Sequence, residues 1–260
     1  MDEMQGRLVS AGPGEPGDQD VLDRTVSEVS EILGLSPDVA RRVVVAFVDF
    51  VVEPLERKLR DLRPADVGRK NPFVYAALGI TSVEGLTQRA AADITSSSIE
   101  GLVGNWLEEV AVVVSGGVKP GGGADLQVDR GGDAKLVDLY SIQSTTNTKN
   151  SKGRTGDEAA LKTSANVLRA QRRTVDLYVA YLFGRQNTTE LRGVTHLSSR
   201  EFWDRVTGQE GFQKRLYQAM PLLAPLLAGR LNSDWAALTE AVGKQFGDSE
   251  GNLDPTKVRL

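Results

Sequence analysis

The sequence has no cysteine and a single histidine, His196, among its 260 residues. The absence of cysteine excludes disulfide bonds, thiolate nucleophiles, iron–sulfur clusters and every zinc site that uses a cysteine ligand. With one histidine, metal centres that need two histidine ligands and nucleases of the His-Asn-His type are also excluded. The side chains left for chemistry are carboxylates, amides, hydroxyls, lysines and arginines, which are typical of magnesium-dependent reactions.

Long apolar runs and export signals are also missing. The longest apolar run, residues 43–52, is interrupted by Asp49 and is about half the ~20 residues that a membrane-spanning helix requires. Residues 1–20 are polar and rich in glycine and proline, without the apolar stretch of a signal peptide, and we expect them to form a disordered arm. The sequence therefore predicts a cytoplasmic protein with no membrane partner.

The length and composition are sufficient for one large domain with helical extensions. With 260 residues, 40% of them hydrophobic and 25% charged, the chain has an ordinary globular composition and can bury a sizeable core. Apolar residues recur at helical spacing from Val26 to Leu33, and Ser36 followed by Pro37 is typical of a helix start. We divide the chain into a disordered arm, a helical N-terminal region, a core with C-terminal helices and a polar tail, at residues 1–20, 21–70, 71–247 and 248–260.

The middle of the chain alternates between helical and strand patterns, which favours a mixed α/β core. A helix capped by Ser97 or Ser98 is predicted over residues 96–114, with a glycine-rich connector after it. A β-hairpin follows, with its turn at residues 131–133. From the hairpin onward we expect two strands at residues 124–130 and 136–144, a helix at 157–172, strands at 175–183 and 191–197, and helices from residue 199.

Polar side chains occur in this core where apolar ones are expected. In the second hairpin strand, Ser141 and Gln143 share a face with Val137 and Leu139. Polar residues on an otherwise apolar face are typical of functional sites. Asp125 begins the first hairpin strand directly after the glycine run, where a carboxylate can project into a cleft.

Two neighbouring segments add further charged and polar groups. The helix before the hairpin carries Glu100, Gly104 and Glu108 on nearly one face, because they are four residues apart. A solvated helix face is the alternative reading of these glutamates. After the hairpin, residues 145–152 (Thr-Thr-Asn-Thr-Lys-Asn-Ser-Lys) are dense in donors suited to phosphate oxygens.

Four segments of this region form a pattern in a fixed order. They are Ser-Ser-Ser-Ile-Glu-Gly-Leu-Val-Gly-Asn-Trp-Leu-Glu at residues 96–108, Ala-Asp-Leu at 124–126, Tyr-Ser-Ile-Gln-Ser-Thr-Thr-Asn-Thr-Lys-Asn-Ser at 140–151, and Glu-Phe-Trp-Asp-Arg-Val-Thr-Gly at 201–208. The pattern resembles the PD-(D/E)XK nucleases, and among them the type II restriction endonucleases. The resemblance covers roughly residues 71–216 and implies an α/β restriction-endonuclease-like core, in which helices flank a mixed central sheet, with N- and C-terminal helical extensions.

The resemblance assigns roles to residues of the hairpin and of the helix before it. Asp125 matches the metal-binding aspartate of the family, and Glu108, or its neighbour Glu109, matches the helix glutamate. The second strand departs from the family pattern, because it has Ser141-Ile142-Gln143 where Glu-x-Lys is usual.

This departure has two consequences for the expected site. The serine resembles that of a subgroup in which the acid has moved to the following helix, where Glu158, or Asp157 beside it, lies at a suitable distance along the chain. Gln143 is similar to the residue used by one branch of restriction enzymes, and its amide can orient a water molecule but supplies no positive charge. The alternatives for restoring that charge are Lys149, Lys152 and Lys162.

The activity implied by the resemblance is Mg²⁺-dependent hydrolysis of phosphodiester bonds at a specific site in double-stranded DNA. Asp125 and Glu158, with Glu108 in the outer shell, would hold one or two Mg²⁺ ions. Ser141 would be a spacer or weak ligand, and Gln143 would orient the attacking water. The resemblance also implies products with 5′-phosphate and 3′-hydroxyl ends.

The distribution of charge favours a polyanionic partner although the net charge is −4. Basic residues concentrate after the hairpin, between Lys149 and Arg173, where they could contact phosphates, and a solvated helix face is the alternative for any single one. Arginine can read guanine, and asparagine or glutamine can read adenine, from the major groove. The expected DNA contacts are Lys149, Asn150, Lys152, Arg154, Lys162, Arg185, Gln186, Asn187 and Arg192.

Further partners follow from the resemblance. A palindromic site calls for a homodimer, with its interface in the N-terminal helices or at residues 220–231. A cognate methyltransferase encoded alongside is expected in the bacterial or archaeal host. The alternative function is a DNA-binding or regulatory protein that has a nuclease-like core and does not cleave.

Two other classes of protein are disfavoured. The glycine run at residues 118–123 lacks the Gly-Lys-Ser/Thr ending of a P-loop and precedes a strand instead of a helix. No Gly-x-Ser-x-Gly sequence is present for a serine hydrolase, so we expect His196 to have a structural role.

Overall fold

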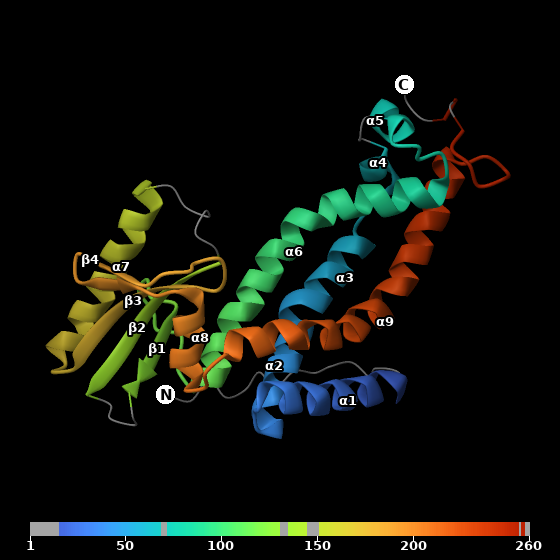
Figure 1. The fold of residues 1–260 in the computed structure, drawn as a ribbon. Helices are drawn as coiled ribbons and strands as arrows, with labels where there is room; N and C mark the ends of the chain where they lie inside the picture. Colours follow the sequence, from blue (N-terminus) through green and yellow to red (C-terminus); the bar gives the residue numbers. More distant parts are fainter. Residues whose placement is uncertain (1–15, 69–71, 131–134, 145–150, 255, 258–260) are drawn as a thin grey trace.

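The computed structural model describes residues 16–68, 72–130, 135–144, 151–254 and 256–257. A small β-sheet lies at one end of the molecule, and a long bundle of helices extends from it (Figure 1). Two long helices, α6 (Val83–Ser115) and α9 (Phe212–Phe246), run from the sheet to the far end of the bundle. They therefore join the two parts into one continuous body.

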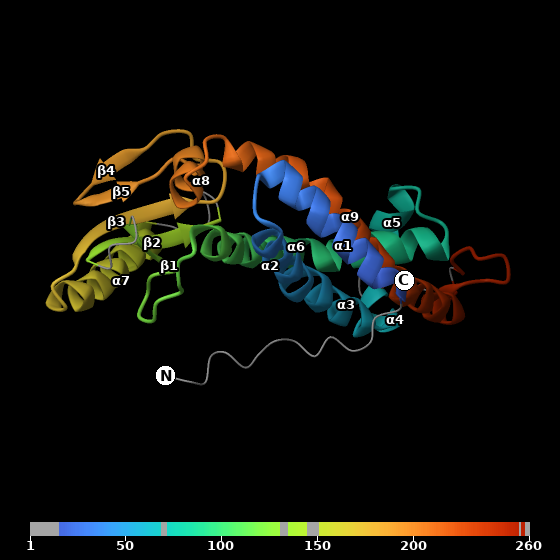
Figure 2. The same cartoon turned by 90° about the horizontal axis from the view of Figure 1, so that it is seen from below.

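The bundle is completed by the N-terminal helices. These are α1 (Pro16–Leu33), α2 (Pro37–Phe47), the π-helical turn η1 (Val48–Val52), α3 (Glu53–Arg60), α4 (Pro64–Val67) and α5 (Pro72–Ala77). The Ser36 side chain caps α2 by accepting from the Val39 N–H at 3.4 Å, as the Ser36-Pro37 pair predicts. Figure 2 shows α1 lying along α9, and α1 also packs against α2.

The sheet has five strands in the order β1-β2-β3-β5-β4. The strands are β1 (Leu126–Asp129), β2 (Leu136–Gln143), β3 (Thr174–Tyr181), β4 (Thr189–Leu191) and β5 (Val194–His196). β1 pairs antiparallel with β2, whereas β3 pairs parallel with both β2 and β5. Since the connection between parallel strands must cross over, α7 (Ser151–Ala170) links β2 to β3.

The two faces of the sheet pack against different helices. Alternate residues of β2 and β3, among them Val137 and Leu177, form one apolar cluster with Leu161 of α7. Tyr140 and Tyr178, on the opposite face, belong to the cluster that includes α6 and α8 (Ser199–Thr207). This mixed sheet flanked by helices confirms the expected α/β restriction-endonuclease-like fold. The predicted division of the chain into arm, N-terminal region, core and tail stays a prediction.

A buried carboxylate ties three strands and α8 together on the second face. Asp138, 5% exposed, accepts from Nε of Arg130 and from Nε of Arg205, each at 3.1 Å. Arg205 also donates to the Tyr178 hydroxyl at 2.6 Å, and Arg130 pairs with Asp176. The hydrogen bonds to Asp138 and then Asp176 raise the pKa of Arg130, so its guanidinium stays charged.

Several helices begin earlier than the sequence predicts. α1 starts at Pro16, inside the segment predicted to be a disordered arm, and α7 starts at Ser151 instead of Asp157. α6 starts at Val83 because the Ser82 side chain caps it, accepting from the Gly85 N–H at 3.1 Å. Serines 96–98 lie within that helix, so the predicted cap there is wrong.

The predicted strand at residues 191–197 is a hairpin instead. Arg192 and Gly193 have φ angles of 54° and 73° and form the two-residue turn between β4 and β5. Two successive positive φ angles are typical of the tight turn that joins antiparallel strands. Arginine is an uncommon residue at such a position, so this turn has little signature in the sequence. Among the described residues, no helix has the length and apolar character needed to cross a membrane.

Candidate active site

The glycine connector brings the start of the hairpin against α7. A Cβ atom on Gly123 would lie 2.7 Å from the Cβ atom of Ala160, and Gly123 has a φ of 106°, so both the contact and the backbone require glycine. Asp125 lies two residues after this contact, and Glu158 lies two residues before Ala160 in α7. The close approach therefore packs the segment that leads into β1, with Asp125, against the part of α7 that carries Glu158.

Asp125 is held by the last residues of β2. Its Oδ2 atom accepts from the Ile142 N–H at 2.6 Å, and its own N–H donates to the Tyr140 carbonyl at 2.8 Å. The β1–β2 register pairs Leu126 with Tyr140, so its extension by one residue places Asp125 opposite Ser141. The side chain is partly exposed, which leaves it accessible from solvent.

Ser141 and Gln143 lie at the carboxyl end of β2, on the face that packs against α7. They are 4% and 5% exposed, and they continue the row of Val137 and Leu139, as the alternation predicts. Buried hydroxyl and amide groups need polar partners, so two of them beside Asp125 make this corner the polar end of an apolar face.

Helix α6 passes close to the end of β2. A Cβ atom on Gly104 would lie 2.9 Å from Oγ of Ser144, the residue after β2. Glu108 is one turn further along the same face of α6 and is half-buried. Its neighbour Glu109 forms an ion pair with Lys119 at 2.9 Å, and the assignment of either residue as the family's helix glutamate stays a prediction.

Glu158 is buried in α7 and contacts the histidine of β5. Its Oε1 atom lies 3.5 Å from Nε2 of His196, and both side chains are 10% exposed. The Tyr181 hydroxyl lies 3.4 Å from the other ring nitrogen, Nδ1. His196, which we expected to have a structural role, therefore contacts a candidate metal ligand.

The loop after β3 is fixed at this end of the sheet. Arg185 and Ser199 exchange two hydrogen bonds, one from the Arg185 N–H to Oγ of Ser199 at 3.1 Å and one from the Ser199 N–H to the Arg185 carbonyl at 3.0 Å. The guanidinium of Arg185 lies over the Tyr181 ring, 4.9 Å from its centroid. Gln186 and Asn187 are exposed at the tip, where they line a shallow pocket with Gly184, Arg185 and Thr189.

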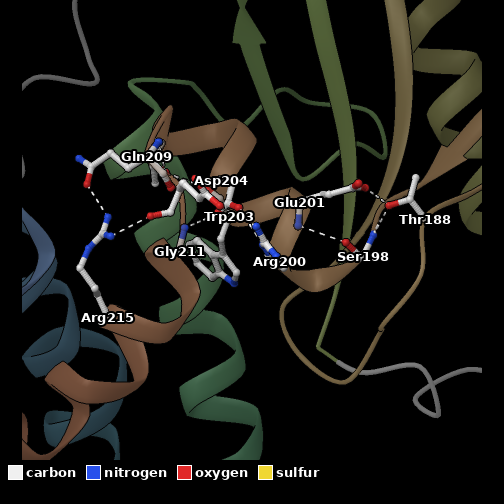
Figure 3. A network of polar contacts seen from close by, with 11 residues as sticks. Thr188, Ser198, Arg200, Glu201, Trp203, Asp204, Gln209, Gly211 and Arg215 are labelled. Atoms are coloured by element: carbon white, nitrogen blue, oxygen red, sulfur yellow. Dashed lines mark hydrogen bonds and ion pairs between the residues drawn. The ribbon is translucent and has the colours of Figure 1, made fainter.

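Helix α8 anchors the loop to the helical bundle (Figure 3). Thr188 accepts from the Ser198 N–H at 2.7 Å and donates to Glu201, and Ser198 caps α8 through the Glu201 N–H at 3.2 Å. At the other end of α8, the Gly211 N–H donates to Asp204 at 2.8 Å. Residues 201–208, part of the family-like pattern, thus carry polar contacts that join the loop to α9.

The other expected DNA contacts are distributed over different places. Lys149 and Asn150 lie outside the described residues, and Lys152 and Arg154 lie in the first turn of α7, where their side chains are not described. Lys162 donates to the Arg192 carbonyl at 3.2 Å, so it braces the β4–β5 turn. β4 separates that turn from residues 184–188, so the structure does not bring Arg192 and Arg185 together.

The basic residues at the end of α7 lie away from the candidate site. Arg169 donates to the Val175 carbonyl at 3.2 Å, and Arg173 pairs with Asp129. These contacts are at the amino end of β3, about 30 Å along the 20-residue helix α7 from its first turn. Arg169 and Arg173 therefore do not contribute to a phosphate-binding surface beside the site, and such a surface at residues 149–154 stays a prediction.

Comparison with known families gives a match. A family model, type II restriction endonuclease EcoO109I, matches residues 39–224, which is well over half of the chain. The protein belongs to this family. The family is part of the PD-(D/E)XK nuclease superfamily, so the predicted resemblance is confirmed. The match includes all five strands and both elements that carry the carboxylates, whereas no curated protein matches the chain.

The candidate side chains fit a hard divalent cation such as Mg²⁺, the usual metal of the family. Asp125 and Glu158 supply carboxylates, and Ser141 and Gln143 supply neutral oxygens. Mg²⁺ is commonly bound by one or two carboxylates together with water and substrate phosphates, so these residue types are chemically suited to it. Within the described residues, no group of three or more His, Cys, Asp or Glu side chains is arranged as a metal site.

Proposed function

We propose that the protein is a Mg²⁺-dependent, site-specific endonuclease that cleaves double-stranded DNA. The observation that carries the proposal is the Asp125 carboxylate bonded to the end of β2, where Ser141 and Gln143 are buried, in a chain of the EcoO109I family. Family membership supports nuclease activity, and the two carboxylates supply the chemistry that this activity needs.

Asp125 and Glu158 hold the metal in this proposal. Bound Mg²⁺ lowers the pKa of a coordinated water and neutralises charge that develops on the phosphate. Asp125 is oriented for this role by the Ile142 N–H at 2.6 Å, and Glu158 by its buried position in α7. Glu108 acts in the outer shell from α6.

Gln143 orients the attacking water in place of the usual lysine. Its amide oxygen accepts a hydrogen bond from the water. The Ser141 hydroxyl on the same strand is a spacer or weak ligand. The oxygen of the water forms a bond to phosphorus and releases one proton to the solvent, the bond from phosphorus to O3′ breaks, and O3′ takes up a proton from the solvent. The products are 5′-phosphate and 3′-hydroxyl ends.

DNA contacts are proposed for two segments, and Lys149 and Asn150 of the first lie outside the described residues. Residues 149–154 precede or begin α7, and Arg185, Gln186 and Asn187 lie in the loop held by α8. A rigid loop with exposed amides is suited to reading base edges. Lys162 and Arg192 remain candidates for phosphate contact on the outer side of the β4–β5 turn.

We also propose the assembly and setting that a palindromic site requires. A homodimer places one active site on each strand, with the interface in the N-terminal helices or at residues 220–231 of α9. A cognate methyltransferase would protect the host DNA in the bacterial or archaeal cytoplasm.

Digestion of defined DNA tests the proposal. Purified protein is incubated with plasmid or phage DNA and Mg²⁺, and Asp125→Asn and Glu158→Gln are compared with the control Asp129→Asn. Asp129 lies at the other end of β1 and pairs with Arg173, so its substitution leaves the corner intact. We expect discrete fragments from the wild type and the control, and none from the other two variants.

The neutral Gln143 favours one alternative, a DNA-binding protein that does not cleave. Tight, sequence-selective binding without fragments in either Mg²⁺ or Mn²⁺ would establish that alternative and overturn the endonuclease. Sequencing of the fragment ends identifies the recognised bases and the position of the cut.

A further inference from the structure

The histidine of β5 connects the candidate metal ligand Glu158 to the loop after β3. Nε2 of His196 lies 3.5 Å from Glu158, and Nδ1 lies 3.4 Å from the Tyr181 hydroxyl. The Tyr181 and His196 rings are nearly parallel, at 29° and with centroids 6.4 Å apart. On the other side of Tyr181, the guanidinium of Arg185 lies 4.9 Å from the ring centroid. A continuous row of contacts therefore runs from Arg185 to Glu158.

The parallel register of the sheet produces this row. β3 pairs with β2 so that Tyr181 is beside Gln143, and β5 pairs with β3 so that His196 is beside Val179 and, through it, Ser141. Paired residues project from the same face, so Gln143, Tyr181 and His196 all face α7. Tyr181 and His196 are 2% and 7% exposed, so water does not screen their contacts.

We propose that His196 and Tyr181 are positioning residues that orient the Glu158 carboxylate and link it to DNA bound at the Arg185 loop. The proposal rests on the endonuclease function above. It gives a role in the site to His196 and Tyr181, neither of which is part of the four family-like segments. Contact of the exposed loop with DNA fixes Arg185 and hence the Tyr181 ring beneath it. The ring in turn holds the imidazole that faces Glu158.

Hydrogen bonding determines which form of His196 does this. In the proposed arrangement the Tyr181 hydroxyl donates to Nδ1, and the imidazole presents the proton on Nε2 to Glu158. At 3.5 Å the contact with Glu158 is longer than a hydrogen bond, and such contacts commonly tighten when metal and substrate bind. Loss of a residue that orients a metal ligand typically lowers metal affinity or activity about 10- to 100-fold.

The single histidine of the chain allows a direct spectroscopic test. Protein labelled with ¹⁵N in histidine gives the imidazole signals of His196 alone, and their chemical shifts report which ring nitrogen carries the proton. We expect the Nε2–H form in the apo protein and a change of the Nε2 signal when Mg²⁺ is added, with loss of that change in Glu158→Gln. A proton on Nδ1, or signals that ignore Mg²⁺ at concentrations that support cleavage, would overturn the proposal.

Substitutions separate positioning from packing. His196→Phe and Tyr181→Phe keep a buried ring but remove the hydrogen-bonding groups, whereas His196→Gln keeps a donor close to the position of Nε2. We expect the first two to slow single-turnover cleavage about 10- to 100-fold while DNA affinity in Ca²⁺ is unchanged, and His196→Gln to recover most of the rate. The control is Tyr178→Phe, which removes a buried hydroxyl from the same strand on the opposite face.

The outcomes distinguish this inference from the endonuclease proposal. Cleavage by the wild type with equal rates for all four variants would reject the positioning role and leave the endonuclease intact. If the wild type does not cleave, the endonuclease fails, and the imidazole signals still decide whether His196 responds to metal at Glu158. A loss of rate in Tyr178→Phe equal to that in Tyr181→Phe would assign the effect to general packing and reject the proposal.

Discussion

Neutralisation of Asp138 tests how much the buried charge cluster stabilises the sheet. Its side chain is 7% exposed and is paired with Arg130 and Arg205, whose side chains are 41% and 37% exposed. Removal of one partner from a buried ion pair costs about 3–5 kcal/mol. Water can take over part of the solvation of these two arginines, so we place the cost of Asp138→Asn at the lower end, about 3 kcal/mol.

The register supplies a matched control for this substitution. Asp176 lies beside Asp138 in the neighbouring strand and pairs with the same Arg130, but its side chain is 48% exposed. An exposed pair contributes about 0.2–1 kcal/mol, so Asp176→Asn is expected to be nearly silent. The two variants differ in burial while the change in charge is the same.

Urea unfolding measured by circular dichroism checks the difference. A loss of about 3 kcal/mol lowers the midpoint in urea without a change in slope. In thermal unfolding the same loss lowers the Tm by roughly 6–12 °C for a domain of this size. Ser141 and Gln143 lie on the other face of the sheet, so DNA cleavage at low temperature is expected to be unchanged. A loss below about 1 kcal/mol, or equal losses for the two variants, would refute the reasoning from burial.

Three further predictions concern the candidate site. Gly123→Ala has to adopt a φ of 106° and also meets Ala160 at 2.7 Å, whereas Gly122→Ala has only the unfavourable φ of 93°. We expect Gly123→Ala to lose more stability in urea unfolding and more cleavage in digestion, and equal losses for the two variants would contradict the close contact. Gln143→Lys restores the usual charge of the family at a buried position, so it is expected to lower stability but raise the cleavage rate in Mg²⁺ by about tenfold or more. An unchanged rate would mean that Gln143 does not occupy the position of the family's lysine. Arg185→Ala removes a cation from the exposed loop and is expected to weaken DNA binding and make the binding less dependent on salt, measured by fluorescence anisotropy at several salt concentrations. Binding identical to that of the wild type would exclude the loop from the DNA contact.

Local patterns in the sequence were sufficient to predict the hairpin and the polar residues on it. Alternation in residues 136–144 gives the two faces of β2, and the structure has Ser141 and Gln143 on the face that alternation assigns to them. Helix starts were harder to predict, because serines occur both at the true cap of α6, Ser82, and inside the helix at residues 96–98. A serine side chain can cap a helix or bond to its own backbone within one, and the sequence does not distinguish the two.

Contacts between distant residues could not be predicted from the sequence. Asp138 and Arg205, and likewise Glu158 and His196, come together only through the strand order and the parallel pairing of β2, β3 and β5. Nothing in the short run Val-Thr-His at residues 194–196 indicates that its histidine faces a carboxylate of α7. Parallel pairing depends on a crossover connection, so its register has no local signature comparable with a hairpin turn.

The same topology explains how a strand with neutral Ser141 and Gln143 can serve the proposed reaction. Both residues are at least 95% buried, and a lysine or glutamate there would need a partner to offset a desolvation cost of several kcal/mol. In the proposed site the second carboxylate comes instead from α7, and the imidazole that faces it comes from β5, two strands away from β2. The charged group on α7 thus has a partner from a different element, and the central strand keeps only groups that are cheap to bury. Because the proposed site is shared among β1, β2, α7 and β5, we expect its metal affinity to depend on how firmly β5 pairs with β3, and hence on Tyr181 and His196.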